Sequence, residues 1–246
     1  MIWRVNFFFV VAFFLPVLLH QLAVITDLPW ISAIPYAWAA LRLTTSGHIW
    51  TAKLVVTFAL AYELFGDLRV SARTTLLVLT STALLLLECV SGHALDQSTA
   101  MFAVYSVHTL SAGVWCGSLA TYALVSKAGP GKSLPLEGAR KLSHVAGVAA
   151  PIAFLSGILI ASKSRALTYP ILLHTEYGYW LSAKVALALG MLGIGAYCRF
   201  MLLPHIYRQA VQTKFLWAVS VEILTSILLL ALAVLLATHP VPSVNA

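Results

Sequence analysis

Histidine placement is the feature of this sequence that most directly suggests chemistry. When the apolar segments are threaded through a bilayer, six of the eight histidines fall at or near one membrane face. Imidazole is the commonest protein ligand for transition metals and the usual axial ligand of haem. This one-sided set on an apolar bundle therefore predicts metal capture or haem ligation. The six are His20, His48, His93, His108, His174 and His239.

Spacing selects a smaller group of metal ligands. Cys89 and His93 are four residues apart, so they share one helical face, where a thiolate and an imidazole form a plausible soft site for Cu(I). His108 lies about 12 Å into its span, which is too deep for an incidental solvent-facing histidine. We expect Cys89, His93 and His108 to point into the bundle, with His20 or His239 completing the metal site.

Three charged residues fall inside the outer half of apolar spans. Lys53 and Lys184 each lie six residues into a helix, at a depth of about 9 Å. Either they snorkel to the headgroups, or they are buried charges at a functional site. Glu88 is the one outer-half carboxylate, so a Lys53–Glu88 pair is available, whereas Lys184 has no obvious partner.

Two other acids are placed near the inner face by the same threading. Glu63 and Glu222 would lie there within reach of Arg69, Arg73 or Arg199. We therefore expect these two carboxylates to be structural.

Composition sets the class of protein that must position these groups. The 246 residues are 61% hydrophobic and 9% charged, whereas a soluble domain has roughly 25% charged residues. The chain is therefore expected to be a single, multi-pass, all-α membrane domain over 1–246. The net charge of +7 comes from basic residues in short loops, which indicates topology and not nucleic-acid binding. There is no nucleophile–base arrangement, phosphate loop or HExxH motif, so no enzymatic activity is expected.

About seven stretches are long enough to cross a hydrocarbon core of ~30 Å. We place them near 6–25, 48–65, 74–92, 100–125, 142–161, 178–203 and 215–237. The first is expected to be a retained helix although it resembles a signal peptide. Ten of the fifteen Lys and Arg residues fall on one side, which places the N-terminus in the cytoplasm and the C-terminus outside. In a bacterial inner membrane the histidine-rich face then meets the periplasm.

Two segments indicate an internal duplication. Gly47–Leu54 (GHIWTAKL) matches Gly178–Val185 (GYWLSAKV), with glycine, Thr or Ser, alanine and lysine in register. A Leu-Thr-Ser triplet also precedes His93 and His239 at almost equal spacing. We therefore predict two parallel three-helix repeats, at about 6–93 and 142–239, joined by a connecting helix at about 100–125. In many transporters built from repeats, the substrate-binding site lies at the interface between the repeats.

Several short motifs resemble the CopD family of copper-resistance membrane proteins. They are His108–Leu119 (HTLSAGVWCGSL), Thr175–Lys184 (TEYGYWLSAK), Arg199 with Pro204 beyond it, and Glu222 in the last span. The resemblance implies copper handling at the inner membrane, with import from the periplasm and a periplasmic copper-binding partner. This chain departs from the family pattern at two places: Cys116-Gly117 stands where Gly-Gly is common, and Cys198 stands where asparagine is common.

The leading hypothesis is a copper transport or copper resistance protein that takes copper at its histidine-rich periplasmic face and passes it inward past His108. One alternative is a membrane subunit of cytochrome type that binds haem b for electron transfer, with His20, His93 and His108 as axial ligands. A second alternative is a non-catalytic assembly subunit in which the histidines are incidental.

Overall fold

The computed structural model describes residues 39, 42–65, 70–90, 98–126, 136–163, 166–167 and 169–238. These residues form helices and turns, with no strand among them. The all-α prediction is therefore confirmed for this part of the chain. The helices are α3 (Thr45–Phe65), α4 (Val70–Val90), α5 (Thr99–Ser126), α6 (Leu136–Lys163), α7 (Tyr169–His174), α8 (Glu176–Tyr197), the π-helix η1 (Cys198–Leu202), the 3₁₀-helix η2 (Leu203–His205) and α9 (Gln209–Thr238).

Three of the described helical stretches are long and apolar enough to cross a membrane. They are Glu137–Lys163 in α6, Glu176–His205 through α8, η1 and η2, and Gln209–Leu236 in α9. They correspond to the last three predicted spans. α3, α4 and α5 lie where the second to fourth spans were predicted, but only α4 contributes a shorter apolar stretch, Thr75–Val90. The first span lies outside the described residues, so the number of seven spans stays a prediction.

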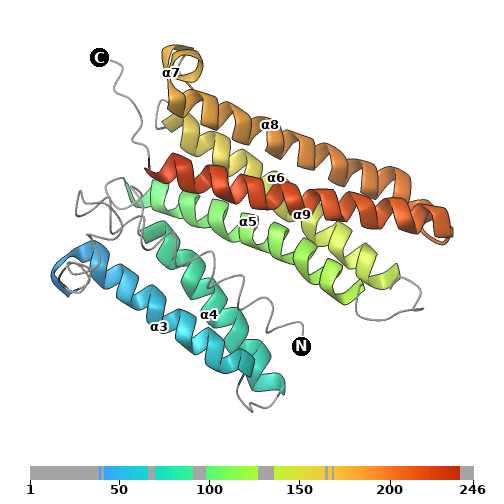
Figure 1. Ribbon diagram of the computed structural model, residues 1–246, viewed down its shortest axis with the longest axis horizontal. Coiled ribbons are helices and arrows are strands. Elements are labelled where there is room, and N and C mark those ends of the chain that lie inside the picture. Colours follow the sequence, from blue (N-terminus) through green and yellow to red (C-terminus); the bar gives the residue numbers. More distant parts are fainter. Residues whose placement is uncertain are drawn as a thin grey trace. The chain divides into compact units, whose positions relative to one another are not determined.

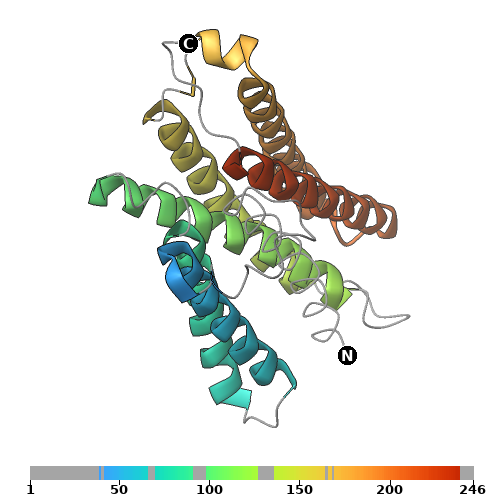
Figure 2. The same ribbon diagram turned by 60° about the vertical axis from the view of Figure 1, so that its left-hand side comes forward.

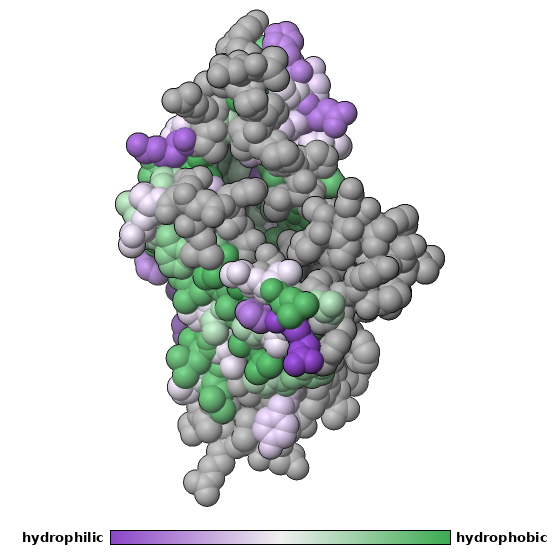
Figure 3. Space-filling model, turned by 90° about the vertical axis from the view of Figure 1, so that its left-hand side faces the viewer, coloured by the Kyte–Doolittle hydropathy of each residue, from purple (hydrophilic) through white to green (hydrophobic). Residues whose placement is uncertain are grey.

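Large apolar side chains cover the outside of the described helices. Phe58, Leu155 and Trp217 are 71%, 64% and 71% exposed. Figure 3 shows such apolar residues in green on one face of the molecule. Side chains of this size are unfavourable in water and favourable against lipid tails. The exposed surface is therefore suited to contact with the lipid tails of a bilayer.

The chain forms two compact units, Met1–Phe102 and Ala103–Ala246, which are described separately. In the first unit, α3 and α4 pack side by side, as both ribbon views show (Figures 1 and 2). The second unit contains nearly all of α5 and the helices that follow it, with α8 packed along α9 (Figure 1). The predicted single domain and the parallel repeat both concern how these units relate, and they remain predictions.

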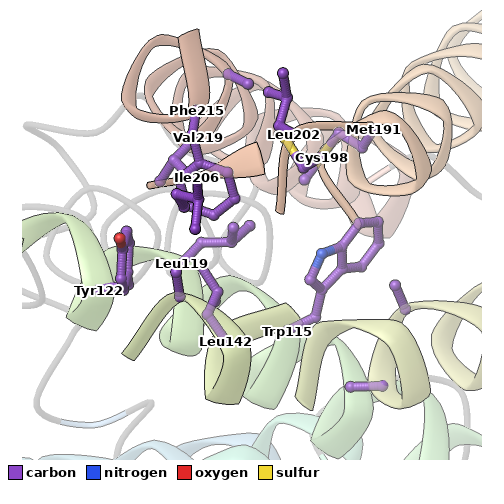
Figure 4. Close-up of a cluster of buried hydrophobic side chains, with 14 of the residues drawn as sticks. Trp115, Leu119, Tyr122, Leu142, Met191, Cys198, Leu202, Ile206, Phe215 and Val219 are labelled. Carbon is purple, nitrogen blue, oxygen red and sulfur yellow. The ribbon is translucent and has the colours of Figure 1, made fainter. Parts of the chain in front are cut away.

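The core of the second unit combines bulky and small side chains (Figure 4). Trp115 and Leu119 of α5 pack with Met191 of α8 and Phe215 of α9 in one buried cluster. α6 contributes alanines at 149, 150 and 153, all nearly inaccessible. Small residues let helix backbones approach closely where lipid provides no hydrophobic drive for association. The α6 surface is therefore suited to receive large side chains from its neighbours.

The corner between α7 and α8 explains the Thr175–Gly178 motif. Thr175 has an extended backbone, and its Oγ1 accepts a hydrogen bond of 3.0 Å from the Gly178 N–H, which caps the start of α8. A Cβ atom on Gly178 would overlap the backbone carbonyls of Ile171 and Leu172. This corner therefore requires a capping hydroxyl and a glycine three residues apart.

Candidate metal centre and intramembrane charges

His108 is held in one orientation by α6. It is the tenth residue of α5, about 14 Å along that helix. Its Nδ1 lies 2.7 Å from the Ala153 carbonyl oxygen and 3.3 Å from the Ser156 Oγ. A carbonyl oxygen can only accept, so Nδ1 carries the hydrogen and donates it. The other ring nitrogen, Nε2, then keeps its lone pair, which is the arrangement found in metal-ligating histidines.

A glycine on α6 provides the space for this ring. A Cβ atom on Gly157 would lie 3.0 Å from the Cε1 atom of His108 and 3.3 Å from its Nδ1. Ser156, the preceding residue, donates from its hydroxyl to the same Ala153 carbonyl at 3.0 Å. One turn of α6 therefore supplies both the acceptor for the imidazole and the gap that receives it.

Lys184 is the charged residue that acts on this histidine. Its ammonium group interacts electrostatically with the His108 ring. Within the ranges that the structure describes, no carboxylate lies within ion-pair distance of Lys184. A positive charge near a neutral imidazole disfavours a second positive charge there unless an anion or a ligand compensates for it.

In the first unit, Lys53 forms an ion pair with Glu88, the carboxylate that the sequence analysis named as its available partner. Its Nζ is 2.9 Å from the Glu88 Oε2, and its side chain is 0% exposed while that of Glu88 is 42% exposed. The ammonium also lies 4.5 Å from the centroid of the Trp50 ring, a cation–π contact. Cys89 is buried and interacts electrostatically with Lys53. Lys53 is therefore a buried, paired charge and does not snorkel, although a functional role for it stays a prediction.

The predicted ligand set is only partly visible. His20, His93 and His239 lie outside the described residues. Cys89 belongs to the first unit and His108 to the second, and the two units are described separately. In the described part of the chain, no group of three or more His, Cys, Asp or Glu side chains is arranged to hold a metal ion. The five-residue site therefore remains a prediction, with the orientation of His108 as its structural support.

The prediction for Glu222 was wrong in depth and in partner. α9 begins at Gln209, which makes Glu222 the fourteenth of its 30 residues and places it in the middle of the helix. Arg199, one of the three arginines that were expected within reach, donates from Nη1 to the Ser143 carbonyl of α6 at 2.9 Å. Glu222 is 4% exposed, and no cation lies within ion-pair distance of it in the described ranges. Counting the last helix from Gln209 would have revealed this depth.

Comparison with known proteins gives consistent results. A family model described as Copper resistance protein D matches residues 137–236, from α6 into α9. Copper resistance protein D of Pseudomonas syringae pv. tomato is 29% identical over 192 residues, covering 73% of this chain and 61% of that protein. Copper transport protein CutJ of Bacillus subtilis (strain 168) is 28% identical over 198 residues, covering 74% of this chain and 35% of that protein.

The matches cover only part of each relative and only some of the residues discussed above. The chain spans less than two thirds of the length of either relative. His108 lies before the range matched by the family model, whereas Lys184, Cys198 and Glu222 lie within it. No solved structure matches this chain. With three membrane-length helices in the described residues, these similarities identify a helical membrane protein and do not favour the haem alternative.

Proposed function

Because this chain belongs to the CopD family, we propose that it transports copper across the bacterial inner membrane and thereby affects copper resistance. Copper would be taken from the periplasmic face, with the N-terminus in the cytoplasm and the C-terminus in the periplasm. A periplasmic copper-binding protein is the expected donor. Both relatives are named for copper, and no catalytic step is part of this proposal.

The observation that carries the proposal is the orientation of His108. The hydrogen bond from Nδ1 to the Ala153 carbonyl leaves Nε2 able to bind copper within an apolar helical unit. An imidazole at this depth has no headgroup to contact, and copper in either oxidation state accepts imidazole nitrogen. His93, Cys89, His20 and His239 are the further ligands that we propose, on the sequence spacing given above.

The test is copper affinity measured on the purified full chain. Cu(I) is titrated in competition with a chromophoric chelator, in the wild type, His108→Ala and His144→Ala. His144 is an exposed histidine of α6 and serves as the matched control. We expect His108→Ala to lose at least about tenfold in affinity, since removing a residue that only orients a metal ligand already costs about 10–100-fold. His144→Ala should match the wild type. A folded His108→Ala protein with wild-type affinity would contradict the proposal.

The same preparations separate the alternatives. A haem b protein would show a Soret band that disappears in His108→Ala. An assembly subunit without a ligand would show neither this band nor stoichiometric copper. Replacing His93 with alanine tests the predicted ligand that lies nearest to His108 in the sequence.

A further inference from the structure

Glu222 is a carboxyl group in the middle of a membrane-spanning helix. It lies thirteen residues after the start of α9 and sixteen before its end, which is about 20 Å and about 24 Å along the helix. Its side chain is buried, at 4% exposure. The site proposed above for copper does not use it. A buried intramembrane acid marks a functional position by default, so its surroundings determine what it can bind.

Three elements of the second unit surround this carboxyl group. Cys116 of α5 and Cys198 of η1 both interact electrostatically with it. From α8, the backbone at Gly195 comes so close that a Cβ there would lie 3.3 Å from the Glu222 Oε1. One turn further along α9, the Ser226 hydroxyl donates to the Glu222 backbone carbonyl at 2.8 Å. The Cys116 thiol also interacts with Ser226.

No positive charge compensates Glu222 among the residues that the structure describes. The basic group nearest in sequence to Cys198 is Arg199, whose guanidinium group is directed to the Ser143 carbonyl on α6. In the described part of the chain, Glu222 takes part in no ion pair. A carboxylate inside a membrane protein costs several kcal/mol unless a cation or a proton neutralises it. We therefore expect a bound cation or proton to neutralise the Glu222 carboxylate.

The chemistry of the neighbours favours a proton over a metal ion. Thiolates are donors that soft metals such as Cu(I) select, whereas a carboxylate suits hard cations. However, the described residues include no cluster of three such groups arranged to hold a metal. A proton needs only the carboxyl group itself. The π-helix that begins at Cys198 is an irregularity often found at functional sites, and it places this thiol beside the acid.

We propose that Glu222 is a proton-binding site that accepts one proton from one side of the membrane and releases it to the other during copper transport. In each cycle the carboxylate gains a proton to become the neutral acid and then loses the same proton. The coupling to copper rests on the proposed function, whereas proton binding by Glu222 does not. The two are therefore tested separately.

The first experiment measures the proton directly. Infrared difference spectra between acidic and alkaline pH are recorded on the purified wild type, Glu222→Gln and Glu137→Gln. Glu137 is an exposed acid at the start of α6, paired with Lys141 on the surface, and serves as the control. We expect a C=O band of a protonated buried carboxyl group that is missing in Glu222→Gln and kept in Glu137→Gln. Cys116→Ser should shift this band without removing it, and this variant decides the question if Glu222→Gln does not fold.

Two infrared results overturn the proposal. One is a wild-type spectrum without a buried protonated carboxyl band. The other is a band that is unchanged in Glu222→Gln. If the band is absent and a Cys116→Ser, Cys198→Ser double variant loses Cu(I) binding, Glu222 belongs to a metal site instead.

The second experiment measures coupling in proteoliposomes that contain a copper indicator and a pH indicator. We expect an imposed pH gradient to stimulate copper flux in the wild type and in Glu137→Gln, and to have no effect in Glu222→Gln. Gradient-stimulated flux in Glu222→Gln, or wild-type flux that ignores the gradient, overturns the coupling. If the wild type moves no copper at all, the proposed function fails, while the infrared result still decides whether Glu222 binds a proton.

Discussion

Replacing Gly157 with alanine should weaken copper binding at His108 without unfolding the protein. The added Cβ would lie 3.0 Å from the Cε1 atom of the ring, whereas ordinary contacts begin at 3.4 Å. The ring must then give by a few tenths of an ångström, which disturbs the 2.7 Å hydrogen bond from its Nδ1 to the Ala153 carbonyl. Complete loss of such an orienting bond costs about 10–100-fold in metal affinity, so this smaller shift should cost up to about tenfold, or about 1.4 kcal/mol.

The fold should tolerate this change because alanine favours a helix over glycine by about 0.5–1 kcal/mol. Gly117→Ala on α5 is the matched control, since nothing lies within 4 Å of a Cβ placed there. The measurements are Cu(I) affinity by chelator competition and the apparent melting temperature in detergent. Equal copper affinity in Gly157→Ala, Gly117→Ala and the wild type would refute the proposed role of the His108 orientation.

Three further predictions concern the rest of the bundle. Glu88→Gln should lower the melting temperature more than Lys53→Met does, because Glu88→Gln removes the carboxylate that pairs with a fully buried ammonium, whereas Lys53→Met leaves a carboxylate that is partly exposed. A thermal double-mutant cycle of the two residues should give a coupling energy of about 1 kcal/mol. Equal stability of all variants would contradict this prediction. Gly147→Ala should displace the Arg199 guanidinium group from the Ser143 carbonyl, because the added Cβ would overlap its Nη1 atom. The melting temperature should then fall below that of Gly117→Ala, and an equal value would show that this hydrogen bond adds no stability. A reporter fused after Ala246 should read as periplasmic, and a cytoplasmic signal would mean an even number of crossings.

The sequence predicted the last three membrane helices, but it did not predict where they begin and end. The last three spans were placed at 142–161, 178–203 and 215–237, whereas the helices that contain them run over 136–163, 176–205 and 209–238. Hydropathy marks only the part of a helix that lies in hydrocarbon. Backbone hydrogen bonding continues through the polar flanks at headgroup depth, so each helix is longer than its apolar stretch.

This difference in helix length caused the error at Glu222. A span that begins at 215 puts this acid two turns from the inner surface, beside the expected arginines. The helix in fact begins at Gln209, and the arginine in question packs against α6. The direction of a long side chain depends on helix packing, which the sequence pattern does not contain.

The sequence placed His108 well inside its helix, but it did not show the partners of the ring. His108 is the tenth residue of α5, and it is half-buried. Ala153, Ser156 and Gly157 surround the ring from a helix that comes about 45 residues later. Alanine, serine and glycine carry no chemical signature of their own. Only the packing of α5 against α6 shows that they orient a potential ligand.

The most direct test of the central claim is X-ray absorption at the copper edge on the purified, copper-loaded full chain. The account predicts the scattering pattern of at least one imidazole ring bound to copper in the wild type and in His144→Ala. In His108→Ala this pattern should lose one imidazole. An identical imidazole signal in His108→Ala, or a wild-type protein that retains no copper, would contradict the claim that His108 binds copper.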